Sequence, residues 1–181
     1  IRYTEAMAKI GQRDKTWQAL MQINPVQLKE VVHNAELRQA NAYFSSSDGD
    51  FKTRYESQEN FGKLKDGSIG VKGGWRIYSS GPGIYLNQLI TAVLGIRQKA
   101  QSVGFAPMLP EKLSGLTLTY QLFDKPVTYN FYPNQSAKIV IDGQEVPFKF
   151  EENPYREGGM EVQKDEVLSL LNEASVIEIY H

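Results

Sequence analysis

Apolar residues recur at helical spacing at the start of the chain. In residues 1–10 they fall near one face of a helix that ends at Gly11, a residue suited to the left-handed turn after a helix. A second helix over residues 15–23 stops before Pro25, and Asp14 is placed to act as its N-cap. The short connection between the two segments predicts a helical hairpin.

The most regular helical pattern covers residues 83–101. Its apolar positions follow the i, i+3, i+4, i+7 spacing of a buried stripe, at Leu86, Leu89, Ile90, Val93 and Leu94. Arg97 and Lys99 fall in its last turns, where cations favour the negative end of a helix. We therefore expect one continuous helix over this whole segment.

Between these helices, residues 24–74 are polar and interspersed with aromatic residues. Loops longer than about 12–15 residues within a compact domain are usually functional or disordered, and disordered segments are poor in aromatic residues. We therefore expect a functional loop region. Aromatic faces together with amide and carboxylate groups suit a sugar, and a packed surface loop is the alternative interpretation.

Strand-like alternation dominates the remainder of the chain. Residues 116–122 and 127–131 alternate apolar and polar positions on either side of a turn and predict a β-hairpin. A second hairpin is expected to turn at Asp142-Gly143, a strong two-residue turn signal. Further short strands flank a helix-like segment near the end. Residues 103–181 therefore predict a small antiparallel β domain.

Composition and charge exclude several classes of function. Lys and Arg total 20 against 21 Asp and Glu, which argues against general nucleic-acid binding. The absence of cysteine excludes disulfides, thiolate chemistry and Cys-ligated zinc, and His33 and His181 form no metal-ligand pair at a useful spacing.

No apolar run approaches the ~18 residues of a membrane span. We expect no signal peptide and a cytoplasmic location. Because the chain opens without Met and inside a helical pattern, we expect a C-terminal piece of a longer protein.

The stretch "SSGPG" precedes the apolar helical segment and has the components of an anion site. The first turn of a helix carries unpaired N–H groups and the positive end of the helix dipole. Ser79 and Ser80 each supply a hydroxyl, Gly81 allows close backbone approach, and Arg76 offers a bidentate charge. An ordinary capping turn without a ligand is the alternative.

Three ordered motifs resemble the C-terminal part of glycoside hydrolase family 94, the inverting disaccharide and oligosaccharide phosphorylases. They are "EAMAKIGQRDKTWQALMQINP", "YSSGPGIYLNQLITAVLGIR" and "FAPMLPEKLSGLTL". The residues of "RQANAYFSSSDGDF" and "VKGGWRIYSSGPGIY" are most similar to those of the family branch that acts on β-1,2-linked oligoglucans and of related domains of cyclic β-1,2-glucan synthases. The motifs cover residues 1 to about 120.

The resemblance implies an α+β protein in two parts. Residues 1–102 would supply the last helices and loops of an (α/α)₆ barrel, and residues 103–181 the C-terminal antiparallel β domain. The family holds phosphate beside a Thr-Gly or Ser-Gly step before the final barrel helix, which is Ser80-Gly81 here, next to Ser79. Many members also use a His between the two preceding helices. This chain has Gln12 and Arg13 in that region and no His; Arg13 would substitute through its charge, or Gln12 by hydrogen bonding.

The resemblance also implies which groups face the sugar and which group is missing. Candidates for the sugar site are Asn41, Tyr43, Asp48, Arg76 and Tyr78. The family's general acid is an Asp in an upstream motif that this chain does not contain, so no catalytic residue is assigned and the segment alone is expected to be inactive.

The implied reaction is cleavage of a β-linked glucan, β-1,2 in particular, by inorganic phosphate to give glucose 1-phosphate. Phosphate is the co-substrate and no cofactor is expected. The expected partners are a β-glucan oligosaccharide, phosphate and the rest of the parent chain, with no nucleic acid and no membrane. Two alternatives are a phosphorylase-like domain of a cyclic β-1,2-glucan synthase and a non-catalytic carbohydrate-binding or structural module.

Overall fold

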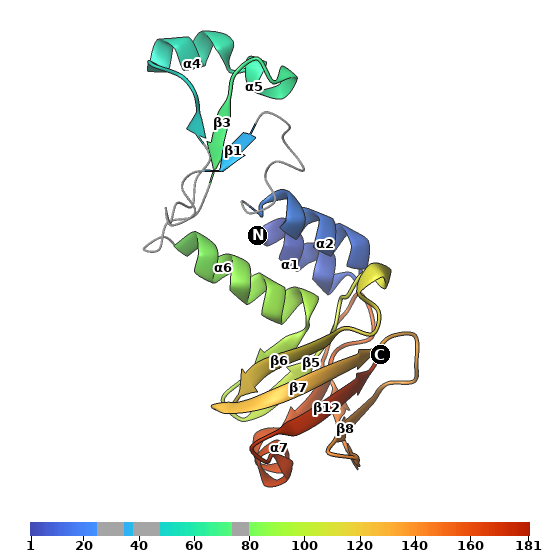
Figure 1. The fold of residues 1–181 in the computed structure, drawn as a ribbon. Coiled ribbons are helices and arrows are strands. Elements are labelled where there is room, and N and C mark those ends of the chain that lie inside the picture. The colour runs from blue at the N-terminus through green and yellow to red at the C-terminus, as the bar shows by residue number, and fades with distance from the viewer. Residues whose placement is uncertain (25–34, 38–47, 74–79) are drawn as a thin grey trace. The chain divides into compact units, whose positions relative to one another are not determined.

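The computed structural model describes residues 1–24, 35–37, 48–73 and 80–181 (Figure 1). By compactness the chain divides into two units. The first unit is Ile1 with residues 18–87, and the second is residues 2–17 with residues 88–181. The division falls within two helices, α2 (Arg13–Gln22) and α6 (Ser80–Gln88).

A small mixed sheet forms the centre of the first unit. The strand order is β1-β3-β2, with β1 parallel and β2 antiparallel to β3. The elements described in this unit besides parts of α2 and α6 are β1 (Ala35–Leu37), β2 (Asp48–Gly49), α4 (Arg54–Asn60), α5 (Lys63–Asp66) and β3 (Val71–Gly73). The described part of residues 24–74 is thus ordered into short elements, where the sequence predicted a loop region.

Helix α4 begins with a reciprocal cap that explains why it starts there. The Thr53 hydroxyl accepts a hydrogen bond from the Glu56 N–H at 3.1 Å, and the Glu56 carboxylate accepts one from the Lys52 N–H at 2.9 Å. This Thr-x-x-Glu pattern satisfies N–H groups that the helix itself leaves unpaired.

The predicted helical hairpin is confirmed, with one correction at its connection. Helix α1 (Arg2–Lys9) ends before Gly11, whose φ of 79° is the left-handed conformation expected there. Helix α2 begins at Arg13, so Asp14 lies in its first turn and is not the N-cap. The preceding residue, Gln12, instead offers its carbonyl to the Thr16 N–H and hydroxyl.

The continuous helix expected over residues 83–101 is wrong. Helix α6 ends at Gln88, a π-helical turn η2 (Leu89–Val93) follows, and β4 (Ile96–Gln98) is already a strand. The Gly95 carbonyl accepts from the Ala106 N–H at 2.9 Å, and β4 pairs antiparallel with the next strand β5, so the chain forms a hairpin here. Tertiary pairing overrides the local helical pattern at this point. Arg97 consequently lies in a strand, and neither it nor Lys99 interacts with a helix end.

The strands of the second unit form two sheets. The four-stranded sheet has the order β10-β11-β5-β4, and the five-stranded sheet has the order β6-β7-β12-β8-β9. The further elements are β5 (Ser102–Phe105), the 3₁₀ turn η3 (Glu111–Leu113), β6 (Thr117–Leu122), β7 (Lys125–Tyr132), β8 (Lys138–Ile141), β9 (Gln144–Val146), β10 (Lys149–Phe150), β11 (Met160–Gln163), α7 (Lys164–Leu170) and β12 (Ser175–Tyr180).

The five-stranded sheet buries alternate residues, as the sequence pattern predicts. In β7 and β12 every second side chain is buried and its neighbours are half-exposed. The buried members pair across the strands, Tyr129 with Ile177 and Phe131 with Ile179. Both predicted hairpins are present, and the second turns at Asp142-Gly143 as expected.

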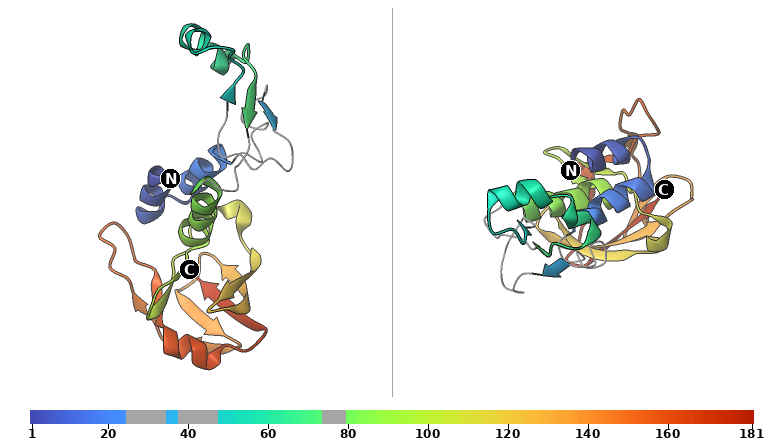
Figure 2. Two further views of the ribbon diagram at one scale, coloured as in Figure 1. Left: turned by 90° about the vertical axis from the view of Figure 1, so that its left-hand side faces the viewer. Right: turned by 90° about the horizontal axis from the view of Figure 1, so that it is seen from above.

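One strand pair departs from the predicted antiparallel arrangement. Strand β12 pairs parallel to β7 and antiparallel to β8. Parallel strands need a long crossover, and the segment that returns the chain includes β8, β9, β10, β11 and α7. Helix α7 contacts β5 and β11 and lies toward the ends of the strands (Figure 2).

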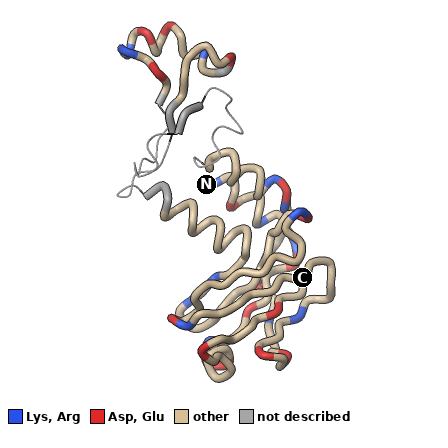
Figure 3. Tube along the Cα trace, in the orientation of Figure 1, with Lys and Arg blue, Asp and Glu red and all other residues tan. Residues whose placement is uncertain are grey.

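These observations confirm the α+β class and the antiparallel-rich character of the C-terminal half. The described helices do not make up an (α/α)₆ barrel by themselves. The domain boundary between residues 102 and 103 stays a prediction. Acidic and basic residues are interspersed along the strand-rich segment (Figure 3), in keeping with a formal net charge of −1.

Candidate functional site

The Ser80-Gly81 step lies at the start of a helix. Helix α6 begins at Ser80, earlier than the predicted start at Gly83, so the step occupies the first turn of the helix rather than preceding it. The N–H groups of a helix's first turn have no partner within the helix, and they lie at the positive end of the helix dipole. A backbone in this arrangement is compatible with an anion site at this step. The side chain of Ser80 lies outside the described part of the chain.

Most of the other predicted site residues also lie outside the described residues. These are Ser79 of the phosphate loop and, among the sugar-site candidates, Asn41, Tyr43, Arg76 and Tyr78. Asp48 is described as backbone only, in β2, where it pairs with Lys72 of β3. The roles of all six remain predictions.

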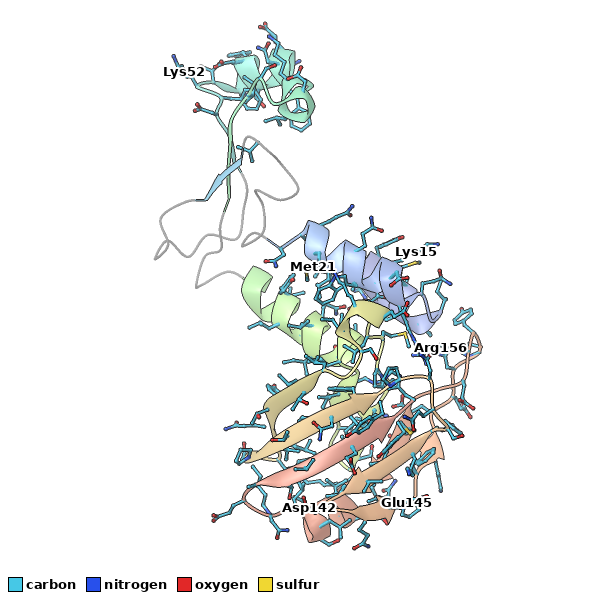
Figure 4. The ribbon with its side chains drawn as sticks, turned by 45° about the vertical axis from the view of Figure 1, so that its right-hand side comes forward. Lys15, Met21, Lys52, Asp142, Glu145 and Arg156 are labelled. Carbon is cyan, nitrogen blue, oxygen red and sulfur yellow. The ribbon has the colours of Figure 1, made fainter. Side chains whose placement is uncertain are left out.

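Arg13 is the predicted site residue whose side chain is described. It lies at the first position of α2 and lines a cavity of about 390 Å³. Arg156 and His181 line the same cavity, although they are far from Arg13 in the sequence. Figure 4 shows Arg156 on the segment that approaches the helices at the start of the chain. The fold thus gathers two guanidinium groups and an imidazole around one cavity.

Arg156 is tied to the start of the chain by its own hydrogen bonds. Its Nε donates to the Ala8 carbonyl at 3.3 Å and its Nη1 to the Glu157 carbonyl at 2.8 Å. Burial lowers the pKa of Arg156, and the nearby guanidinium groups of Arg97 and Arg13 lower it further. Both acceptors are neutral, so neither balances its charge.

His181 follows the last residue of β12 and lines the cavity. Its backbone N–H donates to the Tyr132 carbonyl at 3.0 Å, and its backbone carbonyl accepts from the Gln135 N–H at 3.3 Å. The Nε2 atom is buried and has no hydrogen-bond partner among the described residues. Burial lowers the pKa of His181 to about 4, with a further contribution from the charge of Arg13. The imidazole is therefore neutral at pH 7.

The lowered pKa of His181 predicts a pH dependence of stability. The unfolded state takes up a proton near the ordinary pKa of 6.5 and the folded state only near 4, so stability should fall as the pH falls from about 6.5 to about 4. Unfolding should take up as much as about one extra proton in this window. Denaturant unfolding at several pH values checks this, and His181→Gln should flatten the dependence. An imidazole that titrates near 6.5 in the folded protein would contradict it.

A second group of charges next to the cavity balances internally. Arg97 and Lys99 both pair with Glu151, the latter at 2.8 Å, and Lys99 also pairs with Glu161 at 2.6 Å. These pairings raise the pKa of Lys99 and lower that of Glu161. Two positive and two negative groups therefore cancel, although the charge of Glu151 also acts on Arg156 and partly offsets the lowering of its pKa.

Two glycines shape the cavity wall beside Arg156. A Cβ on Gly158 would lie 1.7 Å from the Glu151 carbonyl oxygen, and one on Gly159 would lie 2.7 Å from the Cβ of Ala106. The Glu151 N–H donates to the Gly159 carbonyl at 2.8 Å, so the segment folds back on itself here. Only glycine permits so close an approach.

No sequence pattern singled out Arg156, and His181 was weighed only as a possible metal ligand. Arg156 stands in a polar stretch with no periodic pattern. The following Gly158-Gly159 pair, which signals close backbone approach, was the available clue. Within the described ranges, no His, Cys, Asp and Glu residues gather into a group that could hold a metal ion. The described helices include none long and apolar enough to span a membrane.

Comparison with known families defines the class of protein. Residues 95–180 match the family described as glycoside phosphorylase C-terminal domain. The match begins at Gly95, where η2 gives way to β4, and it includes both sheets of the second unit. Residues 95–180 thus match a glycoside phosphorylase C-terminal domain, and the resemblance drawn from the motifs is confirmed at the level of a fragment related to the glycoside phosphorylases.

A named relative extends the match over nearly the whole chain. The 1,2-beta-oligoglucan phosphorylase of Listeria innocua serovar 6a is 48% identical over 176 residues, which cover 97% of this chain. The same alignment covers 16% of the relative, so the chain spans about a sixth of that protein's length. The similarity therefore reaches well past residue 120, where the motifs ended.

Proposed function

We propose that this chain supplies the phosphate-binding loop of an inverting glycoside phosphorylase. The substrate would be a β-linked glucan, β-1,2 in particular, cleaved by inorganic phosphate to give glucose 1-phosphate. The observation that carries the proposal is the position of Ser80-Gly81 at the first turn of α6 in a chain 48% identical to a 1,2-beta-oligoglucan phosphorylase. The proposal includes an (α/α)₆ barrel completed by the rest of the parent chain.

In this mechanism the loop holds the nucleophile. Phosphate is already an anion, so no base is needed to activate it, in contrast to the water of an inverting hydrolase. The loop's N–H groups and the Ser80 hydroxyl keep the phosphate in line with the glycosidic carbon, assisted by Ser79. Proton donation to the leaving sugar oxygen comes from an Asp elsewhere in the parent protein.

The proposed sugar contacts come from the segments before the loop. Asn41, Tyr43, Asp48, Arg76 and Tyr78 offer the amide, carboxylate, guanidinium and aromatic groups that bind sugar hydroxyls and ring faces. Inorganic phosphate is the co-substrate, and the proposal includes no cofactor. The proposed partners are the glucan, phosphate and the remainder of the parent chain, with no nucleic acid and no membrane, in the cytoplasm.

Ser80→Ala in the full-length protein tests the loop. Loss of one hydrogen bond to a charged group should raise the KM for phosphate roughly tenfold or more, because such bonds contribute about 1.5–3 kcal/mol. The KM for the glucan should change far less. Ser136→Ala, at an exposed serine in the second unit, is the matched control and should change neither value. An unchanged phosphate KM in Ser80→Ala would remove Ser80 from the mechanism.

A further inference from the structure

The cavity of the second unit has a surplus of positive charge. Arg13 and Arg156 both line it, and neither has a carboxylate within ion-pair distance among the described residues. The carboxylates nearest in sequence are Asp14, which lines a neighbouring pocket with Arg13, and Glu157, which lines this cavity without an ion pair. The Arg97 and Lys99 network beside it is already neutral.

The cavity also contains a buried polar atom that lacks a partner. A buried donor or acceptor without a hydrogen bond is costly and rare in folded proteins. The His181 Nε2 is such an atom, and in the tautomer with a proton on Nε2 it donates a hydrogen bond without a net charge. Two guanidinium groups and one neutral N–H donor are the donor set that an oxyanion prefers.

The walls of the cavity define what else the ligand carries. Phe105, Met108, Phe150 and Met160 supply apolar surface, and Gln135 and the Gly158-Gly159 backbone supply polar groups. The volume of about 390 Å³ lies within the range of about 300–1,000 Å³ that small-molecule sites occupy. It is larger than a phosphoryl group alone requires, which leaves room for a small polar body attached to the anion.

We propose that Arg13, Arg156 and His181 form a binding site for a phosphoryl group, either free phosphate or the phosphate of a sugar phosphate. The site is built entirely from residues of the second unit, whereas Ser80 and Gly81 belong to the first. The inference does not rest on the proposed phosphorylase function. Bound phosphate lowers the mutual repulsion of Arg13 and Arg156 and satisfies the His181 Nε2.

The test counts phosphate sites in the full-length protein by equilibrium titration with inorganic phosphate. Arg156→Gln and His181→Gln should each weaken one class of site about tenfold or more. Arg2→Gln is the control for loss of one positive charge, because Arg2 is almost fully exposed and pairs with Glu5. Arg156 also donates a hydrogen bond to the Ala8 carbonyl; if Arg156→Gln fails to fold, His181→Gln keeps the test valid, because the His181 Nε2 has no hydrogen-bond partner among the described residues.

A second readout separates this site from the phosphate loop. Ser80→Ala should leave the Arg156-dependent binding unchanged, and His181→Gln should leave the phosphate KM of the reaction unchanged. Titration with glucose 1-phosphate in the Ser80→Ala background identifies the source: tighter binding than phosphate assigns a sugar phosphate, and equal binding assigns the phosphoryl group alone. Absence of binding that depends on Arg156 or His181, with either probe, would overturn the proposal.

Discussion

Gly95→Ala is expected to lower the free energy of unfolding of the second unit by about 3 kcal/mol or more. Gly95 has a φ of 70°, and a Cβ there would lie 2.2 Å from the carbonyl carbon and 2.3 Å from the carbonyl oxygen of Ala106. Backbone atoms cannot rotate away as a side chain can. Relief therefore requires the hydrogen bond from the Ala106 N–H to the Gly95 carbonyl to break, and β4 to separate from β5.

Gly143→Ala separates the contact from the backbone strain. Gly143 has a φ of 83° in the β8–β9 turn, and a Cβ there would meet nothing within 4 Å. This substitution should cost only the roughly 1–2 kcal/mol of the left-handed conformation. Denaturant unfolding combined with hydrogen exchange of the β5 amides measures both variants. Equal losses of stability would show that the Ala106 contact contributes nothing.

Phe131→Ala should lower the free energy of unfolding of the second unit by about 3–5 kcal/mol. The Phe131 side chain is 1% exposed at the centre of the five-stranded sheet, opposite Ile179 of β12. Its removal leaves a cavity between strands that are paired on both sides, so the surroundings can collapse only in part. Hydrogen exchange of the β7 and β12 amides should accelerate accordingly.

Phe150→Ala is the matched control for Phe131→Ala because it deletes the same atoms. Phe150 is 47% exposed on the edge strand β10, where its ring meets Phe148 edge to face at a centroid distance of 5.2 Å. Its removal should cost less than about 1.5 kcal/mol. A loss as large as that of Phe131→Ala would mean that β10, rather than the β7–β12 pair, limits the stability of this unit.

Local patterns predicted the elements whose cause is local. The Gly11 stop, the buried alternation of β7 and the Asp142-Gly143 turn each depend on residues within a few positions, so each was readable from the sequence. The start of α6 was predicted only approximately: the apolar pattern placed it at Gly83, whereas the helix begins at Ser80, because small residues and proline also begin a helix through their own backbone preferences.

The candidate loop was readable from the sequence for the same reason, and the cavity was not. The "SSGPG" stretch is contiguous, and it is part of a motif that resembles the phosphorylases. Arg13 is separated from Arg156 and His181 by most of the chain, and the three meet only because the helices at the start of the chain and the segment of Arg156 approach each other. No periodicity relates them, so no local pattern could have grouped them.

The sequence by itself determined the α+β class, the family and the position of the Ser80-Gly81 step. The tertiary structure alone decided that residues 96–98 form a strand, that β12 runs parallel to β7, and that two arginines and a buried imidazole share one cavity. The physical reason is that helices, turns and alternation arise from neighbours along the chain. The pairing of β12 with β7 and the clustering of the three side chains depend instead on partners from far away in the sequence, and β4 pairs with β5, which is itself held by the distant strand β11.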